Sequence, residues 1–371
     1  MTTSIFWILV INAGTLLAMD SSNAAILTSI NRYDSLGIMQ LIDWAHMHNV
    51  QLIIVGDRKT PLYPSGLSDD SHVNFVSIDE QNDSYPQLSR SLPENHYARK
   101  NIGYVIAHQL NKDVILDTDD DNLPLLDVFD INIESLRAIQ DDGTWLNVYR
   151  LFGLQHLWPR GLPLEAAYRE VSEAQLVWNV GNLPLSQLMT SNNSNEPRVG
   201  CFQSLVDGDP DIDAIGRMLF PGNHVFSNDV PVILDFDQVC PTNSQATLWR
   251  KELFPLLYLP VTASFRMTDI WRGIIGQVIM KRMGYTTVFG KLRIIQSRNE
   301  HSLLDDFRSE IDGHLFTKEI HSIAQELLAN IEILSMNDLK DALTRVYERL
   351  VKEKYLYPQE LVSLQNYLAF F

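Results

Sequence analysis

The stretch Leu116-Asp-Thr-Asp-Asp-Asp-Asn122 places four carboxylates within five positions, directly after the apolar residues Val114 and Ile115. Because the acidic run continues an apolar strand, its backbone is fixed in the sheet. The carboxylates therefore cannot move apart into solvent. Crowded carboxylates repel one another unless a cation or protons relieve them. Asp119 and Asp121, on alternate positions, are therefore predicted to coordinate one hard divalent ion, Mg²⁺ or Mn²⁺, with a diphosphate completing its shell.

Three other interpretations of this run were weighed. A solvated acidic turn or a calcium loop would also be rich in Asp, but the run lacks the glycine and glutamate of an EF-hand. Asp117-x-Asp119 after a strand is also typical of haloacid-dehalogenase-type phosphatases. Those enzymes have Thr or Val where this chain has Asp121, and they place the motif on the first core strand. The position of the run after a later strand favours a metal–diphosphate site.

Upstream of the acidic run, apolar segments of strand length alternate with segments of helical periodicity. We predict strands over 24–30, 50–55, 73–78 and 113–117, and helices over 36–48 and 96–110. Such alternation requires crossover connections and a mostly parallel sheet, whose ligands sit at the carboxyl ends of the strands. Asp57 and the acidic run both follow strands, so we expect them to face one crevice.

The alternation of strand-like and helix-like segments becomes less regular after about residue 143. The pattern predicts strands over 145–149, 175–180 and 247–249, and helices over 211–220 and 268–283. From Phe316 onward apolar residues recur at helical spacing, which predicts a packed accessory bundle, with a partner-binding helix as the alternative.

Composition limits the classes of function. The chain has 371 residues, 45% of them hydrophobic and 20% charged, as in an ordinary globular protein. Its formal net charge of −17 argues against nucleic acid as a partner. Cys201 and Cys240 cannot form a disulfide framework; they could form one bridge or remain two buried thiols.

Residues 1–22 form a possible signal peptide or membrane anchor, because Ser4 to Met19 is apolar and uncharged. The alternative is an N-terminal segment packed on the domain. The triplets Asn82-Asp-Ser and Asn192-Asn-Ser are compatible with a secretory route. We therefore expect a Golgi or secretory location and possible membrane association through the N-terminus, with a cytoplasmic location as the alternative.

Several polar segments could contact an anionic ligand. Arg99 and Asn101 open a predicted helix, where free N–H groups favour anions. Asp57 suits a ribose or base contact and Lys59 a phosphate, although a plain turn would have the same residues. Three later segments, 207–213, 241–245 and 268–273, are dense in polar groups, and Asp269 could be either a site residue or a helix cap.

The order of these motifs resembles that of the STELLO family, a plant Golgi glycosyltransferase group with relatives in other eukaryotes. The blocks that carry the resemblance are Val55-Gly-Asp-Arg-Lys-Thr-Pro61, Ala98-Arg-Lys-Asn-Ile-Gly-Tyr104, Asp117–Asn122, Val206-Asp-Gly-Asp-Pro-Asp-Ile-Asp-Ala214, Asn243-Ser-Gln-Ala-Thr-Leu248, Leu259-Pro-Val-Thr-Ala-Ser-Phe-Arg266, Asp269-Ile-Trp-Arg-Gly273 and Arg298-Asn-Glu-His301. They cover roughly residues 24 to 310. The chain also resembles, more loosely, the reversibly glycosylated polypeptides and the large inverting GT-A families.

This resemblance implies an α/β fold of the GT-A type, a Rossmann-like mixed sheet flanked by helices with a C-terminal helical extension. It implies a GT-A domain over 23–310 and the helical extension over 311–371. Plant members of the family carry a long cytosolic N-terminal region and a clear anchor, which this chain matches only through residues 1–22.

The resemblance also implies roles for individual residues. Asp119 and Asp121 resemble the metal-binding DxD pair, and His301 the C-terminal metal ligand. Asp269 stands where inverting members keep their general base. The residues implied in donor binding are Asp57 at the nucleoside, Arg99 at the diphosphate, and Lys59, Asn101, Asp120, Asn243, Gln245 and Trp271 along the donor or acceptor pocket.

The activity so implied is transfer of a sugar from a nucleotide-diphospho-sugar to a hydroxyl of a glycan, lipid or protein acceptor, with inversion. The cation would neutralise charge on the leaving diphosphate. Two other classes stay open: a sugar-nucleotide mutase or self-glycosylating protein, and a non-catalytic scaffold of the same fold.

Overall fold

A parallel βαβ unit begins the fold. The computed structural model describes residues 22–64, 70–139, 143–169, 171, 176–193, 198–296 and 302–371. Strand β1 (Asn23–Ser29) leads into α1 (Leu36–His48), and β2 (Gln51–Gly56) then returns parallel to β1. Strand β3 (Val73–Val76) pairs parallel to β2 at the edge of the sheet. The predicted helix over 36–48 is confirmed at both ends.

The sheet is mixed rather than wholly parallel. Its order is β3-β2-β1-β4-β10-β8-β11-β9-β6-β7. Strand β4 (Val114–Thr118) is parallel to β1, and β10 (Ala246–Arg250) is antiparallel to both β4 and β8 (Val199–Ser204). The remaining strands of this sheet are β6 (Asn132–Ala138), β7 (Leu176–Pro184), β9 (Val232–Ile233) and β11 (Thr286–Gly290). A short antiparallel ribbon joins β5 (Asn122–Pro124) to β12 (Ile294–Gln296).

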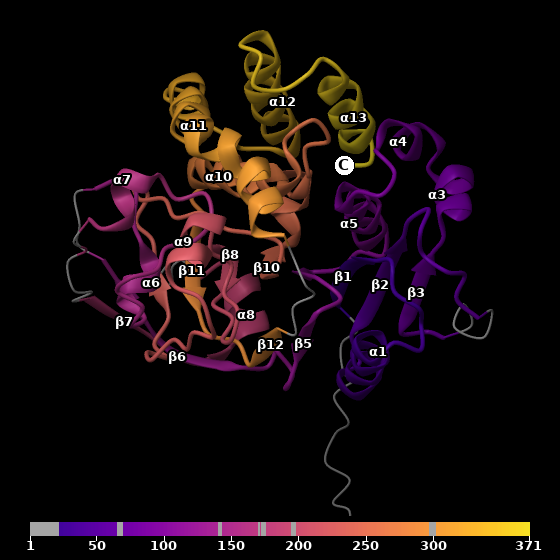
Figure 1. The fold of residues 1–371 in the computed structure, drawn as a ribbon, viewed down its shortest axis with the longest axis horizontal. Helices are drawn as coiled ribbons and strands as arrows, with labels where there is room; N and C mark the ends of the chain where they lie inside the picture. Colours follow the sequence, from indigo (N-terminus) through magenta and orange to yellow (C-terminus); the bar gives the residue numbers. More distant parts are fainter. Residues whose placement is uncertain are drawn as a thin grey trace, which may run out of the picture.

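Helices cover both faces of the sheet (Figure 1). Successive side chains of β1 point to opposite faces of the sheet, so alternate residues pack against different helical layers. Ala24 and Ile26 pack in the core beneath α5 (Lys100–Gln109) and α10 (Thr268–Arg282), whereas Ala25 and Leu27 pack in the core beneath α1. The predicted class, a mixed α/β sheet flanked by helices, is confirmed.

Three C-terminal helices, orange to yellow in Figure 1, pack together; the first two contact α10, and the last contacts the second and α4 (Pro86–Ser91). They are α11 (Leu303–Leu328), α12 (Met336–Lys352) and α13 (Gln359–Leu368), and their buried residues belong to the same core as α5 and α10. The short helices are α3 (Ile78–Ser84), α4 (Pro86–Ser91), α6 (Val148–Leu151), α7 (Leu164–Ala167), α8 (Leu185–Thr190) and α9 (Ala214–Leu219), with 3₁₀ turns η1 (Tyr97–Arg99), η2 (Lys251–Leu257) and η3 (Phe265–Met267).

Two local predictions were wrong. In place of the expected strand over 145–149, Trp145 makes an isolated bridge to Val239, and α6 begins at Val148. The chain turns here because the Asn147 side chain donates to the carbonyls of Leu157 and Ala167. The expected helix over 211–220 begins only at Ala214, because Asp213 caps it by accepting from the Gly216 N–H.

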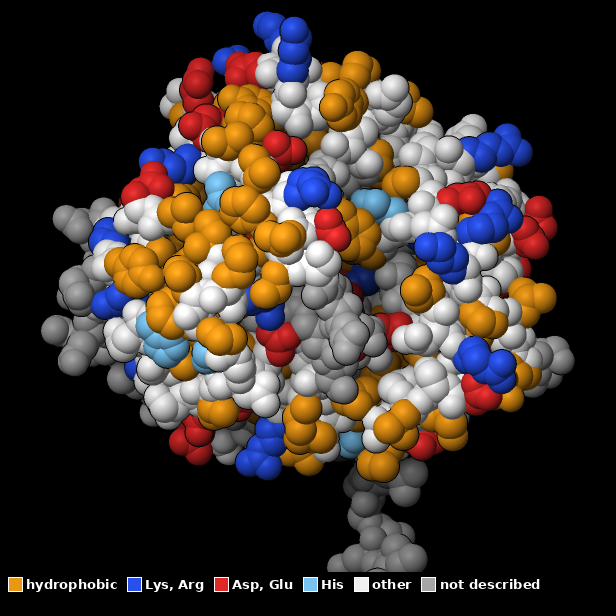
Figure 2. Space-filling view, in the orientation of Figure 1, with side chains coloured by type: hydrophobic (Ala, Val, Ile, Leu, Met, Phe, Trp, Pro, Cys, Tyr) orange, Lys and Arg blue, Asp and Glu red, His pale blue; other side chains and the backbone are white. Residues whose placement is uncertain are grey.

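Other features of the chain bear on the sequence predictions. Cys201 and Cys240 are separate buried thiols. In the part of the chain that the structure describes, none of the helices has the length and apolarity needed to cross a bilayer. The predicted N-terminal segment 1–22 lies almost wholly outside the described residues. Acidic and basic side chains are interspersed over the face shown in Figure 2.

Candidate functional site

The carboxyl ends of three neighbouring parallel strands form one edge of the sheet. Register pairs Ser29 at the end of β1 with Gly56 at the end of β2, and β4 runs parallel on the other side of β1. Asp57 and the acidic run therefore follow strands that end at the same edge, which confirms their predicted placement. Helix α1 closes on this edge so tightly that a Cβ at Gly37 would lie 2.7 Å from the Asp120 carbonyl oxygen.

The first carboxylate of the run is a structural residue. Asp117 is fully buried, and Arg272 of α10 donates from Nη1 to its Oδ2 at 2.6 Å. The Lys100 ammonium lies 3.0 Å from Asp117 Oδ1 and donates to Asp119 Oδ1 at 2.9 Å. Two buried cations thus neutralise Asp117 and hold the start of the acidic run against the sheet.

The next three carboxylates line a cavity. Burial raises the pKa of Asp119 to about 7, with repulsion from Asp121 adding to the effect and Lys100 opposing it, although 40% of the Asp119 side chain is still exposed. Asp120 accepts from Ser29 Oγ at 2.5 Å and from Asn31 Nδ2 at 2.8 Å, and burial raises its pKa as well. Asp121 accepts from Asn122 Nδ2 at 2.9 Å and lies beside Gln296 of β12. Asp119 and Asp120 therefore resist full ionisation in the absence of a cation.

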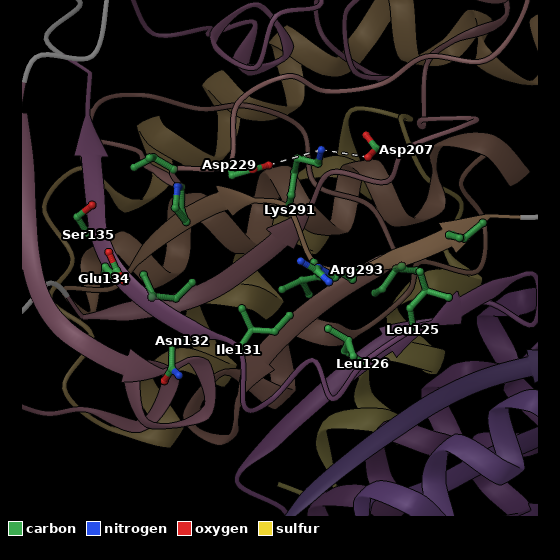
Figure 3. A pocket seen from close by; sticks show the side chains of 16 residues that line it. Leu125, Leu126, Ile131, Asn132, Glu134, Ser135, Asp207, Asp229, Lys291 and Arg293 are labelled. Carbon is green, nitrogen blue, oxygen red and sulfur yellow. Dashed lines mark ion pairs between the residues drawn. The ribbon is translucent and has the colours of Figure 1, made fainter.

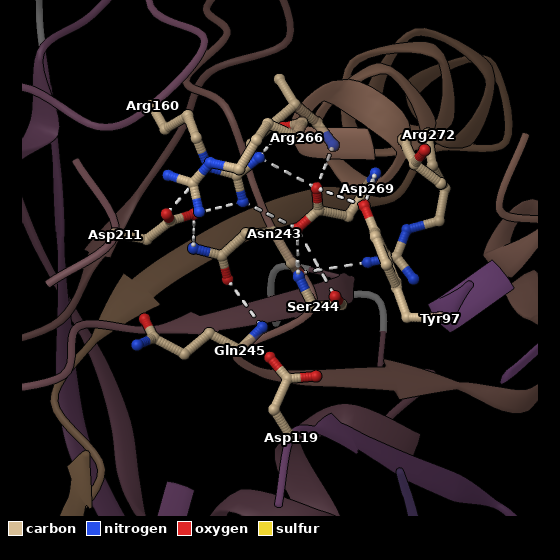
Figure 4. A network of polar contacts seen from close by, with 12 residues as sticks. Tyr97, Asp119, Arg160, Asp211, Asn243, Ser244, Gln245, Arg266, Asp269 and Arg272 are labelled. Atoms are coloured by element: carbon tan, nitrogen blue, oxygen red, sulfur yellow. Dashed lines mark hydrogen bonds and ion pairs between the residues drawn. The ribbon is translucent and has the colours of Figure 1, made fainter. Parts of the chain in front are cut away.

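Asp269 and Arg160 form the opposite wall of this cavity of about 270 Å³, in which Asp119, Asp120 and Asp121 also take part. Arg160 donates from Nη1 to Asp269 Oδ1 at 3.1 Å and from Nη2 to Oδ2 at 3.0 Å, as Figure 4 shows. Arg266 lies beside them and pairs with Glu310 of α11. The cavity therefore has carboxylates on its floor and guanidinium groups on the wall above.

The Asp269 carboxylate is held on all sides. Its Oδ2 accepts from the Ser244 N–H at 3.1 Å, and its Oδ1 accepts from the Ile270 N–H at 3.1 Å and from Tyr97 Oη at 3.2 Å. Burial alone would raise the pKa of Asp269, but the Arg160 charge, the hydrogen bonds from Arg160 and the Arg272 charge together outweigh burial, so the pKa lies below its ordinary value. Asp269 is therefore ionised at neutral pH.

Arg160 is in turn fixed by a second acid. Asp211 accepts from Arg160 Nε and Nη2, both at 2.8 Å, and Arg160 lowers the pKa of Asp211 despite its burial. Asn243 donates to Asp211 Oδ2 at 2.8 Å and accepts from the Gln245 N–H at 3.0 Å. A continuous polar network thus links Asp211 and Asp269 to the segment that enters β10 (Figure 4).

The structure brings together some of the predicted site residues. Asp119, Asp120, Asp121 and Asp269 line the cavity, while Asn243 and Gln245 support it from behind through the network. Asp57 organises the adjoining turn, where its Oδ2 accepts from the His96 N–H at 2.9 Å. Lys59 is exposed in that turn.

Three predicted residues lie elsewhere, and one is not described. Arg99 is buried and donates to Gln81 Oε1 and Ser89 Oγ of α3 and α4. Asn101 exchanges two hydrogen bonds with the Leu259 backbone, and Trp271 donates to Thr317 Oγ1 in the core between α10 and α11. His301 lies outside the described residues.

Seven residues that line this cavity were not recognisable as site residues from the sequence: Thr28, Tyr97, Arg160, Ser244, Phe265, Arg266 and Gln296. Arg160 lies between Pro159 and Gly161 and belongs to no recognisable motif, so the sequence around it did not indicate a functional role. Tyr97 and Arg266 stand within or beside quoted motifs, and their roles depend on contacts with Asp269 and Glu310 that are distant in sequence.

A second, larger groove of about 860 Å³ is lined in part by β12 and by the residues that follow β5. Gln296 of β12 lines the cavity, whereas its neighbours Ile294 and Ile295 line the groove. Figure 3 shows Arg293 in the middle of the groove, between Leu126 and the Lys291 ammonium, which pairs with Asp207 at 3.0 Å. The groove combines an apolar floor with cations.

Comparison with known proteins shows similarity to glycosyltransferases. The family model of STELLO glycosyltransferases matches residues 266–370. Two curated proteins of Arabidopsis thaliana are similar to the chain: the probable glycosyltransferase STELLO2, 29% identical over 58% of this chain and 29% of its own length, and the probable glycosyltransferase STELLO1, 27% identical over 71% of this chain and 34% of its own length. The chain spans about a third of the length of these relatives.

These matches show that the chain is similar to the STELLO-type glycosyltransferases, as the sequence motifs indicated. Among solved structures, glucosyl-3-phosphoglycerate synthase from Mycobacterium tuberculosis in complex with phosphoglyceric acid aligns with 82% of this chain and 85% of its own, at 11% identity and a TM-score of 0.40.

Proposed function

We propose that this protein is a GT-A-type glycosyltransferase that moves a sugar from a nucleotide-diphospho-sugar to an acceptor hydroxyl, with inversion, in the cavity between the acidic run and Asp269. The observation that carries the proposal is that Asp269 and Arg160, which are far in sequence from Asp119 and Asp121, line one cavity together with them. The relationship to STELLO glycosyltransferases supports the same class of reaction.

A divalent cation fits the donor set of the acidic run. Asp119 and Asp121 offer carboxylate oxygens, the ligands that Mg²⁺ and Mn²⁺ prefer. The pKa of Asp119, raised to about 7 by burial, marks a carboxylate that a cation would relieve. When bound there, the ion would supply charge neutralisation to the leaving diphosphate.

The cations above the acidic floor would bind and orient the same anion. Arg266 is a planar donor on the cavity wall and is fixed by Glu310. The N–H groups of Arg160 already bond to Asp211, Asp269 and the Arg266 carbonyl, so Arg160 would act on the anion through its charge. Groups held in this way need little reorganisation when charge develops on the diphosphate.

Asp269 would accept the proton of the attacking hydroxyl through Oδ1. The Tyr97 hydroxyl has a single proton, and the Phe265 carbonyl at 2.8 Å is a nearer acceptor than Asp269 Oδ1 at 3.2 Å. An acceptor hydroxyl could therefore replace Tyr97 at this oxygen. Because Arg160 lowers the pKa of Asp269, proton transfer would come late, when bond formation has made the hydroxyl acidic.

The acceptor would approach the cavity along the groove of Figure 3, because Ile294 and Ile295 of the groove directly precede Gln296 of the cavity in β12. Leu126→Trp narrows the groove, so the KM for the acceptor should rise while the Kd of the donor nucleotide is unchanged. An unchanged acceptor KM would place the acceptor elsewhere.

The experiment that tests the proposal is incubation with labelled nucleotide sugars and Mn²⁺, with and without acceptors. Transfer to an added acceptor supports the proposal, and label on the protein itself without any acceptor supports the self-glycosylating alternative. Nucleotide binding with neither outcome would leave the scaffold class as the better account.

A further inference from the structure

Two histidines and an aspartate meet at the amino-terminal end of β2 and β3, on the opposite edge of the sheet from the acidic run. His46 lies in the last turn of α1, and Asp70 and His72 lie in the segment that enters β3. The Leu52 N–H donates to the His72 carbonyl at 2.7 Å, which fixes this segment beside the start of β2. Since β2 runs from Gln51 to Gly56, the group lies about 17 Å from the edge that carries Asp57.

One ligand atom from each of these three side chains lies within 4.8 Å of the other two. His46 Nε2 is 2.6 Å from Asp70 Oδ2, and His72 Nδ1 is 3.8 Å from Asp70 Oδ1. Tetrahedral Zn²⁺ with bonds of about 2.0–2.1 Å separates its ligand atoms by roughly 3.3 Å. Small side-chain rotations therefore suffice to bring all three atoms onto one ion.

A neighbouring amide orients His72 as a ligand. His72 Nε2 lies 3.0 Å from Asn49 Oδ1, an oxygen that can only accept, so Nε2 carries the proton. Nδ1 then has a lone pair that can accept a proton or bind a metal, and it faces Asp70. In this structure the Ser71 hydroxyl, 3.2 Å from Nδ1, donates to that lone pair. Asn49 has this position because it caps α1 in the left-handed conformation, with φ of 53°. Such an outer hydrogen bond fixes the tautomer and ring direction of metal-bound histidines.

Asp70 and the helix also suit a cation. The His72 N–H donates to Asp70 Oδ1 at 2.9 Å, which fixes the carboxylate between the two rings. His46 lies at the carboxyl end of α1, where the last carbonyls of a helix favour positive charge. The rings of His46 and His72 stand at 89° with centroids 5.3 Å apart, so they approach from different directions.

We propose that His46, Asp70 and His72 form a Zn²⁺ site that joins the end of α1 to the edge strand β3. Two imidazoles and one carboxylate favour Zn²⁺ over Mg²⁺ or Mn²⁺, and a water would complete the tetrahedron. The site is separate from the catalytic cavity and stabilises the half of the sheet that carries Asp57. It does not depend on the proposed transferase reaction.

The test is equilibrium dialysis of the purified chain against Zn²⁺, with Co²⁺ absorption as a second readout of tetrahedral ligands. His72→Ala and Asp70→Asn should each weaken Zn²⁺ binding by a hundredfold or more, and Zn²⁺ should raise the Tm of the unsubstituted protein only. The matched control is His48→Ala on the same helix, where His48 faces Asp127 instead. Asp121→Ala, in the acidic run, should also leave this Zn²⁺ binding unchanged.

Circular dichroism of each variant confirms that it is folded before binding is compared. If the protein binds no Zn²⁺, or if His72→Ala and Asp70→Asn both bind it as tightly as the unsubstituted protein, the proposal is overturned. Loss of Zn²⁺ binding in Asp121→Ala would assign the ion to the acidic run and would overturn it equally.

Discussion

The Asp269 carboxylate and the Arg160 guanidinium form a bidentate ion pair on one wall of the cavity, with Nη–Oδ distances of 3.1 and 3.0 Å. Arg160 also binds Asp211 through two points, so one guanidinium links two buried acids. This arrangement allows the role of Asp269 as a base to be separated from its role as a partner of Arg160.

We expect Asp269→Asn to lower transfer by a hundredfold or more while donor binding survives, because the amide keeps the shape and loses the basicity. Single-turnover transfer of a labelled donor sugar measures this. Asp211→Asn is the matched control, since it also removes one carboxylate from Arg160. If the two variants lose equal rate, Asp269 acts only by positioning Arg160.

Removal of the Arg272 charge should be strongly destabilising. Arg272→Met leaves Asp117 buried with Lys100 as its one remaining cation among the described contacts, and breaking a buried pair costs about 3–5 kcal/mol. Urea unfolding measures the change in the free energy of unfolding. Arg349→Met breaks the solvent-exposed pair with Glu353 and should cost far less. Similar losses in both variants would contradict a structural role for Asp117.

Stability should fall in mild acid because of His321. Burial of His321, which packs against Trp145, together with the nearby Lys281 charge lowers the pKa of His321 to about 4 from its ordinary 6.5. Below pH 6.5 the unfolded chain therefore binds more protons than the folded chain, and stability falls as pH drops from 6.5 to 4, by up to about 3 kcal/mol.

The measurement is Tm against pH for the unsubstituted protein and for His321→Leu. The variant should lose part of the acid slope, and above pH 7, where His321 is neutral in both states, the difference between the two proteins should be constant. An identical acid slope in both proteins would show that His321 does not cause it.

The elements and residues that could be predicted from the sequence are those specified by periodicity or by motifs of neighbouring residues. The helix over 36–48 and the strands around it follow from periodicity alone, and the acidic run was recognisable because it continues the β4 strand. Asp269 was singled out through its motif at the start of α10. In each case the residues that decide the outcome are neighbours in the chain.

The parts that could not be predicted depend on tertiary contacts. Arg99 has the charge of a diphosphate ligand, yet Gln81 and Ser89 draw its guanidinium into the packing of α3 and α4. Arg160 has no local motif and becomes a site residue only because Asp211 and Asp269 converge on it from distant segments. Within the acidic run itself, the structural role of Asp117 required knowledge of Arg272, which lies 155 positions away.

The most direct test of the central claim is calorimetric titration with UDP and GDP in the presence and absence of Mn²⁺. The account predicts that one nucleotide binds with Mn²⁺, that Asp121→Ala abolishes this binding in a folded protein, and that Asp130→Ala, at an exposed acid outside the cavity, leaves it unchanged. Equal nucleotide affinity of Asp121→Ala and the unsubstituted protein in Mn²⁺ would contradict the assignment of the acidic run as the donor site.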